Sequence, residues 1–246
     1  MNRRGKGLAV RLVKYTGKSP HFIHPKHLVS LPWTAWYLAH LHPSDRVLDV
    51  GCANGTHTLR VAGRCRSVVG VDYDQTQLGV AHAQLGVAGA SNVAFVLADV
   101  TTGWPFREKQ FDAVLCLDVI EHLVPRGEVL RTIRRGLKDD GRLLISAPNR
   151  ETAWRRRLRE AGLFAFSDPD HKVEYTREEF TEELERGGFR VESLQPAVYD
   201  TPWAGLIDVL GGLSLALYRR LATWKRQRAL TTPAESTGFW VVARPR

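Results

Sequence analysis

The chain has 246 residues and a mass of 27.7 kDa, which fits one domain of ordinary size or one domain with a sizeable insertion. Its composition, 43% hydrophobic and 25% charged, is typical of a globular protein that buries a core. Three scattered cysteines suit a reducing compartment, no apolar run reaches the ~18 residues of a spanning helix, and Gly7–Val10 is too short for the centre of a secretory signal. We therefore expect a cytoplasmic protein rather than a secreted, collagenous or polytopic membrane protein.

The net charge of +9 is concentrated at the two ends of the chain. Residues 1–44 carry seven basic and no acidic side chains, and residues 203–246 carry seven basic and two acidic ones. The body between them, 45–202, has a net charge of −3. Basic ends attract anionic partners such as phosphorylated substrates, nucleic acid or an anionic membrane surface, but they can equally serve only solubility.

The predicted elements begin with a basic N-terminal arm over residues 1–44. Within it, helical spacing of apolar residues predicts a cap helix at Leu31, Trp33, Trp36, Tyr37 and Leu41. Seven short β-branched runs follow, several of them apolar on both faces as buried parallel strands are. They are Arg46–Val50, Ser67–Asp72, Val93–Ala98, Phe111–Leu117, Arg142–Ala147, Arg190–Leu194 and Phe239–Ala243. Helical patterns separate the strands, so the sequence predicts an α/β sheet covered on both faces.

One helix start has a local signature. Thr176 is followed three residues later by Glu179, the spacing of a capping box, and then by Phe180 and Leu184 at helical spacing. We expect a helix to begin at this point.

Two connections are longer than an α/β sheet needs. They are residues 150–175 and residues 195–238, which we interpret as insertions in one domain spanning 45–246. Such connections usually form lids or docking elements. Within the second, Trp203–Tyr218 is the most apolar segment and is followed by a basic stretch up to residue 228. It could be a lid over an apolar pocket, an interfacial helix on anionic lipid or a dimer interface, and the oligomeric state stays open.

A glycine turn follows the first strand. The run Asp49-Val50-Gly51-Cys52-Ala53-Asn54-Gly55 leads into a predicted helix. Glycines at such a turn let the backbone approach a ligand, and a helix N-terminus offers free N–H donors. The spacing differs from the G-x-G-x-x-G of dinucleotide sites. A carboxylate at Asp49 repels phosphate and suits a cationic or amino-bearing ligand.

Two further acids end the next strands. Asp72 lies 21 residues after Gly51, the distance at which an acid can bind ribose hydroxyls. Asp99 follows the third strand and could accept a hydrogen bond from an exocyclic amine. Together these acids describe a nucleoside that bears an amino group and no phosphate.

These motifs resemble the class I S-adenosylmethionine-dependent methyltransferases over roughly residues 46–194. The resemblance rests on Val47–Gly55, Val69–Asp72, Asp99 and Phe111–Leu123, and it implies a Rossmann-like, seven-stranded, mostly parallel sheet with S-adenosylmethionine as methyl donor. In that family the glycine loop holds the methionine part, the acid matching Asp72 the ribose and the acid matching Asp99 the adenine. The cofactor-binding residues it implies are Asp49, Gly51, Cys52, Ala53, Gly55, Asp72, Tyr73, Asp99, Val100 and Leu117. Ala53 departs from the glycine of many members.

The fourth strand is followed by Asp118-Val119-Ile120-Glu121-His122, a segment with three polar side chains that we name the polar run. It resembles the motif of quinone-pathway O-methyltransferases. We take His122, Asp118 and His171 as the candidate catalytic residues. His122 could act as a general base near neutral pH, or it could only cap the strand. Asp118, Glu121, His122 and His171 resemble the divalent-metal ligands of some O-methyltransferases, but mixed oxygen and imidazole ligands are permissive, and we do not favour a metal.

The expected activity is O- or C-methylation of a hydrophobic or anionic small molecule. The chain lacks the Asn/Asp-Pro-Pro-Tyr run with which some similar families methylate amines. Its absence argues against that branch. RNA remains an alternative acceptor, and a binding scaffold that has lost transfer is a rival from another functional class. Peripheral contact with an anionic membrane is also open.

Overall fold

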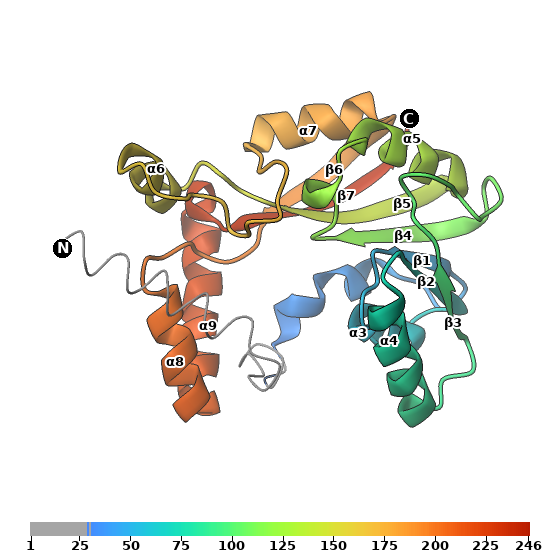
Figure 1. Ribbon diagram of the computed structural model, residues 1–246, viewed down its shortest axis with the longest axis horizontal. Coiled ribbons are helices and arrows are strands. Elements are labelled where there is room, and N and C mark those ends of the chain that lie inside the picture. The colour runs from blue at the N-terminus through green and yellow to red at the C-terminus, as the bar shows by residue number, and fades with distance from the viewer. Residues whose placement is uncertain (1–28, 30) are drawn as a thin grey trace.

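The computed structural model describes Val29 and residues 31–246, so most of the arm predicted over 1–44, residues 1–28 and 30, lies outside the described residues. Seven strands form one sheet in the order β3-β2-β1-β4-β5-β7-β6 (Figure 1). Strand β7 runs antiparallel to both β5 and β6, and the remaining neighbours are parallel. The strands are β1 (Arg46–Val50), β2 (Ser67–Asp72), β3 (Val93–Leu97), β4 (Phe111–Leu117), β5 (Leu137–Pro148), β6 (Phe189–Pro196) and β7 (Gly238–Pro245). The predicted α/β, mostly parallel sheet is confirmed.

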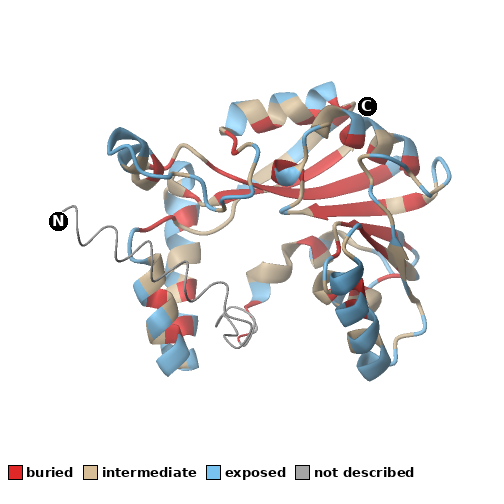
Figure 2. Cartoon of the chain, viewed as in Figure 1, coloured by how far each residue is buried: buried red, intermediate tan, exposed pale blue. Residues whose placement is uncertain are grey.

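Helices cover both faces of the sheet. On one side lie α5 (Arg126–Gly136) and α7 (Arg177–Arg186), and on the other α3 (Thr56–Ala62) and α4 (Gln75–Ala88) (Figure 1). The central strands are buried on both faces because alternate residues enter two separate clusters. In β4, for example, Val114 packs with α5 and α7, whereas Leu115 packs with α3 and Tyr37. Figure 2 shows the resulting buried sheet between more exposed helices.

The chain order creates a crevice beside β1. The chain runs outward from β1 to β2 and β3, and then returns to place β4 on the other side of β1. In open α/β sheets the ligand binds where the strand order reverses in this way, at the carboxyl ends of the strands. The glycine turn after β1 and the polar run after β4 lie at this edge.

The two insertions contain the remaining helices. The first holds α6 (Ala153–Glu160), and the second holds α8 (Ala204–Leu213), α9 (Leu215–Thr231) and the short η3 (Pro233–Glu235). A buried ion pair joins them, because Arg155 of α6 contacts Asp200 at 3.3 Å between Nε and Oδ2. The Thr152 hydroxyl donates to the same carboxylate oxygen at 2.6 Å. The insertions therefore form one connected end of the molecule (Figure 1).

The local predictions match the structure to different degrees. The capping box is confirmed, since Thr176 accepts from the N–H of Glu179 and the Glu179 side chain accepts in return. The cap-helix segment is a 3-10 helix, η1 (Pro32–His40), with a kink at Ala35. Its Tyr37 is fully buried against the sheet. No helix among the described residues is long and apolar enough to cross a bilayer.

Candidate functional site

The turn between β1 and α3 is left-handed at three residues. Gly51, Ala53 and Gly55 have φ angles of +69°, +45° and +77°. At Gly51 a side chain is also excluded by space, because a Cβ there would lie 2.5 Å from Cγ2 of Val119. Ala53 carries a Cβ in a conformation that favours glycine. The turn thus brings backbone close to the crevice at a conformational cost.

Asp72 supports this turn from the end of β2. Its Oδ2 accepts from the N–H of Ala53 at 2.7 Å, and its Oδ1 accepts from the N–H of Asp74 at 2.9 Å. The carboxylate is mostly buried yet lines the cleft. It therefore holds the loop in place and still faces the space that a ligand would occupy.

The cleft has a volume of about 620 Å³, within the range of small-molecule sites. It runs from the glycine turn and the ends of β2 and β3 to the polar run after β4. Its lining consists of Gly51, Ala53, Val71, Asp72, Tyr73, Asp74, Gln77, Ala98, Asp99, Val100, Asp118, Val119, His122, Leu123, Asp170 and Lys172.

The structure brings six of the ten expected cofactor residues into the cleft wall. These are Gly51, Ala53, Asp72, Tyr73, Asp99 and Val100. Asp99 also forms a local turn, since its Oδ1 accepts from the N–H and the hydroxyl of Thr101 at 2.8 and 2.6 Å. Tyr73 is largely exposed, as a side chain at the rim would be.

The other four expected residues lie outside the lining. Asp49 is buried behind the turn, where its Oδ2 accepts from the Thr58 hydroxyl at 2.6 Å. Burial raises the pKa of Asp49 to about 7. Cys52 is also buried, and Gly55 caps α3. Leu117 packs on the face of the sheet that α3 and Tyr37 cover. Asp49 is therefore placed to stabilise the loop rather than to contact a ligand directly.

At the other end of the cleft, Asp118 has a left-handed backbone with φ +55°. Ser146 of the adjacent strand holds it there. The Ser146 hydroxyl donates to Oδ1 of Asp118 at 2.6 Å and accepts from the Asp118 N–H at 3.0 Å. The sequence analysis missed Ser146, because only the register of β5 beside β4 places it there.

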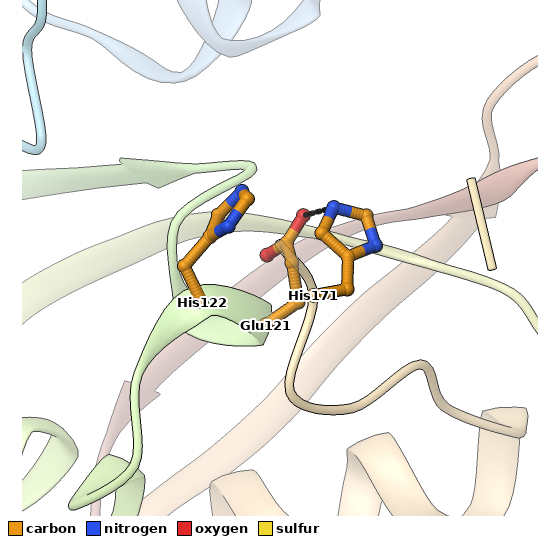
Figure 3. Close-up of side chains that lie close together, drawn as sticks. All are labelled: Glu121, His122 and His171. Atoms are coloured by element: carbon orange, nitrogen blue, oxygen red, sulfur yellow. Dashed lines mark ion pairs between the residues drawn. The ribbon is translucent and has the colours of Figure 1, made fainter. Parts of the chain in front are cut away.

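The three side chains of Glu121, His122 and His171 converge at the end of the polar run (Figure 3). The two imidazole rings are edge-on with centroids 4.7 Å apart. Oε1 of Glu121 lies 3.8 Å from Nε2 of His171. Burial, followed by the charge of Asp118, raises the pKa of Glu121 to about 9. Burial, followed by the charge of His171, lowers the pKa of His122.

Glu174, which the sequence analysis did not select, orients His171. Its Oε1 lies 2.8 Å from Nδ1 of His171 and accepts from the Ser167 hydroxyl. Burial opposes ionisation of Glu174, but the hydrogen bonds from His171 and Ser167 outweigh it and lower its pKa. A buried carboxylate on Nδ1 leaves Nε2 of His171 facing Glu121 and His122. In the sequence, the spacing of three residues between His171 and Glu174 was the signal that could have indicated this contact.

The same cluster has the donors of a divalent-metal site. One donor atom from each of Glu121, His122 and His171 lies within 4.8 Å of the others. Oε2 of Glu121 is buried and has no hydrogen-bond partner among the described residues. A carboxylate behind a ligating histidine, as Glu174 is behind His171, is a usual outer-shell arrangement in metal sites. The residues therefore fit a divalent cation.

The family model that matches this chain is a methyltransferase domain, aligned over residues 26–194. Two relatives are a probable S-adenosylmethionine-dependent methyltransferase of Mycolicibacterium smegmatis, 32% identical over 63% of this chain and 56% of that protein, and the 27-O-demethylrifamycin SV methyltransferase of Amycolatopsis mediterranei, 30% identical over 63% and 67%. A ubiquinone biosynthesis O-methyltransferase of Pseudomonas aeruginosa is 34% identical over 43% of this chain and 45% of that protein. The chain thus spans about half the length of the mycobacterial and pseudomonad relatives.

Solved structures share the fold at lower sequence identity. The [4+2]-cyclase SpnF has a TM-score of 0.65 at 20% identity and matches 98% of this chain and 94% of its own. A methyltransferase from Methanosarcina mazei has a TM-score of 0.60 at 17% identity, over 88% and 98%. The family match covers two thirds of the sequence. The sheet order and the glycine turn with its supporting acid indicate the same family. The chain belongs to the class I S-adenosylmethionine-dependent methyltransferases.

Proposed function

We propose that the chain transfers the methyl group of S-adenosylmethionine to an oxygen or carbon of a hydrophobic or anionic small molecule. The observation that supports this most directly is that two sets of residues line one cleft. The glycine turn, Asp72 and Asp99 line one end, and Asp118 and His122 line the other. A donor bound at the first end would place its reactive carbon toward the second.

The fit to the cofactor comes from the chemistry of the wall. S-adenosylmethionine supplies an electrophilic methyl group on a cationic sulfonium. Asp72 offers the remaining lone pairs of its carboxylate to ribose hydroxyls, and Asp99 offers its carboxylate to the adenine amine. The carboxylates also make this end of the cleft favourable for a cation. Asp49 contributes from behind by fixing the turn.

His122 is the proposed general base. It lines the cleft, and its lowered pKa keeps the imidazole neutral and able to accept a proton at pH 7. His122 takes the proton of the acceptor hydroxyl as the acceptor oxygen bonds to the methyl carbon. The carbon–sulfur bond breaks at the same time, and its electron pair stays on sulfur. Asp118 and His171 position the base and the acceptor.

Oxygen is favoured over carbon as the acceptor atom. The names of two relatives, the ubiquinone biosynthesis enzyme and the demethylrifamycin enzyme, specify transfer to oxygen. The acceptor end of the cleft combines apolar Val119 and Leu123 with the cation of Lys172, which suits an apolar molecule that carries a negative charge.

A divalent cation is a second candidate for activating the acceptor. Glu121, His122 and His171 would hold it, and it would lower the pKa of a bound acceptor hydroxyl. The unpartnered, buried Oε2 of Glu121 is the observation that supports this alternative. Isothermal titration with Zn²⁺ or Co²⁺ distinguishes the two. Binding that is lost in Glu121→Gln favours the cation, and no binding favours the base.

The proposed function is tested with a labelled methyl donor and a panel of phenols, hydroxy acids, carbon acids and RNA. We expect label in a small molecule, a His122→Gln variant with at least tenfold lower turnover, and an unchanged His42→Gln control, because His42 is exposed and outside the cleft wall. In the wild type the rate should fall in acid as His122 is protonated, at a pH below the ordinary range of a histidine, because burial lowers the pKa of His122. Transfer only to RNA contradicts the acceptor class. Cofactor binding without any transfer favours a scaffold.

A further inference from the structure

Helix α8 is apolar on two opposite sides. Its inner side, with Ile207, packs against Tyr218 and Ala222 of α9 and against Val29 and Leu31. Its outer side carries a stripe at spacings of three or four residues, which places the side chains in one row. The stripe consists of Trp203, Leu206, Val209 and Leu213, which are 60%, 51%, 48% and 82% exposed.

The first insertion adds apolar side chains next to this stripe. Leu163, Phe164 and Phe166 follow α6 and are also exposed. A hollow of about 270 Å³ joins the two insertions, with Leu158 and Leu163 on one side and Pro202 and Trp203 on the other. Helices α6 and α8 lie at the same end of the molecule (Figure 1). We name these seven exposed side chains, four on the α8 stripe and three after α6, the apolar end face.

Cations without a carboxylate partner occur on the helices of the same two insertions. Arg157 lines the hollow, and Arg219 and Arg220 follow the tip of the α8–α9 hairpin. All three are exposed and, among the described residues, lack a carboxylate within 4.0 Å. Arg155 differs, since its charge is satisfied by Asp200. From 203 to 232 the chain has five basic residues and one acid, Asp208. The occupant of the face must therefore offer both apolar and anionic groups.

We propose that the apolar end face docks on the surface of an anionic lipid bilayer. A row of Trp and Leu with flanking arginines is the composition of interfacial elements, in which apolar side chains enter the lipid and cations meet the headgroups. A second copy of the chain is disfavoured as the occupant of this face. A two-fold contact would bring the arginines of one copy close to the same arginines of the other, and like charges repel. The sequence before Val29 adds seven cations and no acid, which increases attraction to the same surface.

None of the seven side chains of the apolar end face lines the cleft. Among the described residues, none from α8 or α9 lines it, so the lid that the sequence analysis considered for Trp203–Tyr218 is not what this arrangement supports. The proposal does not depend on the methyl acceptor. It concerns where the protein meets a surface, and the cofactor site serves only as a check of folding.

The test is flotation of the full chain with vesicles of phosphatidylcholine alone or mixed with phosphatidylglycerol. We expect the wild type to float only with the anionic vesicles and to dissociate in high salt. The double variant Leu206→Glu/Leu213→Glu should bind at least tenfold less. The control Val87→Glu changes an apolar residue on α4 that is even more exposed, at 92%, and should bind as the wild type does.

Three results would overturn the proposal. The wild type fails to float, the double variant floats as well as the wild type, or light scattering shows a dimer that the double variant dissociates. Cofactor affinity of each variant, measured by calorimetry, verifies that it is folded. In the second result the basic N-terminal residues alone carry the lipid affinity, and in the third a second copy covers the face. Replacing Arg219 and Arg220 by Gln should reduce anionic binding while the apolar row remains intact.

Discussion

Ser146 and Asp118 exchange two hydrogen bonds across the neighbouring strands β5 and β4. This pair holds a left-handed aspartate, with φ +55°, at the wall of the cleft. Backbone strain of this kind persists only where surrounding contacts impose it, and it is frequent at functional sites. The pair therefore connects a core strand to the acceptor end.

Replacing Ser146 by Ala should destabilise the protein by about 1–2 kcal/mol, because a buried hydroxyl and its two hydrogen bonds are lost. Asp118→Gly loses one of these two hydrogen bonds but adopts φ +55° without strain, so it should destabilise the protein less than Ser146→Ala does. Both variants should reduce methyl transfer. Thermal unfolding and turnover measured together separate the effects, and full activity in both variants would remove Asp118 from the site.

Two substitutions in the glycine turn should change the stability of the protein in opposite directions. Ala53→Gly should stabilise the protein by about 0.5–1 kcal/mol, because relief of the left-handed alanine, about 1–2 kcal/mol, exceeds the added freedom of the unfolded chain. Gly51→Ala should destabilise it and weaken cofactor binding at least tenfold, since its Cβ meets Val119. Denaturant unfolding and calorimetry check both. A destabilised Ala53→Gly variant would contradict the proposed strain.

The sequence predicted the sheet well because its strands are continuous apolar runs that end at glycine or acid. Three strands, Arg46–Val50, Ser67–Asp72 and Phe111–Leu117, have the predicted bounds. Strand β5 starts at Leu137, before the predicted Arg142. Leu137 pairs with Phe111 and Arg142 with Ala113, so residues 138–141 fall in a register shift. Their sequence, Lys138-Asp139-Asp140-Gly141, has no strand pattern, and the prediction therefore missed them.

The site was less predictable, because it depends on contacts between distant segments. The motif order located Asp72 and Asp99 at the cleft. The motif order could not show that Asp49 accepts a hydrogen bond from Thr58 behind the turn. Nor could it show that Leu117 packs on the face of the sheet covered by α3. Glu121 and His171 meet although 50 residues separate them, and only the packing of the first insertion against the end of β4 brings them together.

Asp72 should be the most sensitive acid for the cofactor. Asp72→Asn removes a charged acceptor that supports the turn and faces the ligand, and hydrogen bonds to charged groups contribute about 1.5–3 kcal/mol. We expect affinity for S-adenosylmethionine to fall about 10- to 100-fold. Asp140→Asn, an exposed acid away from the cleft, is the control. Equal affinities in the two variants would refute the assignment of Asp72 to the ribose.

The buried carboxyl of Glu121 predicts a pH dependence of stability. Its pKa is about 9 in the folded protein against 4.5 as the ordinary value, so the native state holds a proton that the unfolded state releases. Stability therefore falls as pH rises between these values. Glutamine does not ionise, so the Glu121→Gln variant does not lose this stability. Its melting temperature should therefore rise relative to that of the wild type as pH increases from about 5 to about 9.

The control for this measurement is the exposed Glu182→Gln, which should show no such gain. A chelator is needed, because a bound cation would hold Glu121 ionised and remove the effect. A constant difference between Glu121→Gln and the wild type in chelator would show that Glu121 ionises normally.

The most direct test of the central claim is calorimetric titration of the wild-type chain with S-adenosylmethionine and S-adenosylhomocysteine, with NAD as a control. The geometry of the turn, Asp72 and Asp99 predicts micromolar binding of the first two and none of NAD. Absence of binding to both sulfur ligands, or equal binding of NAD, would contradict the assignment of this cleft to the methyl donor.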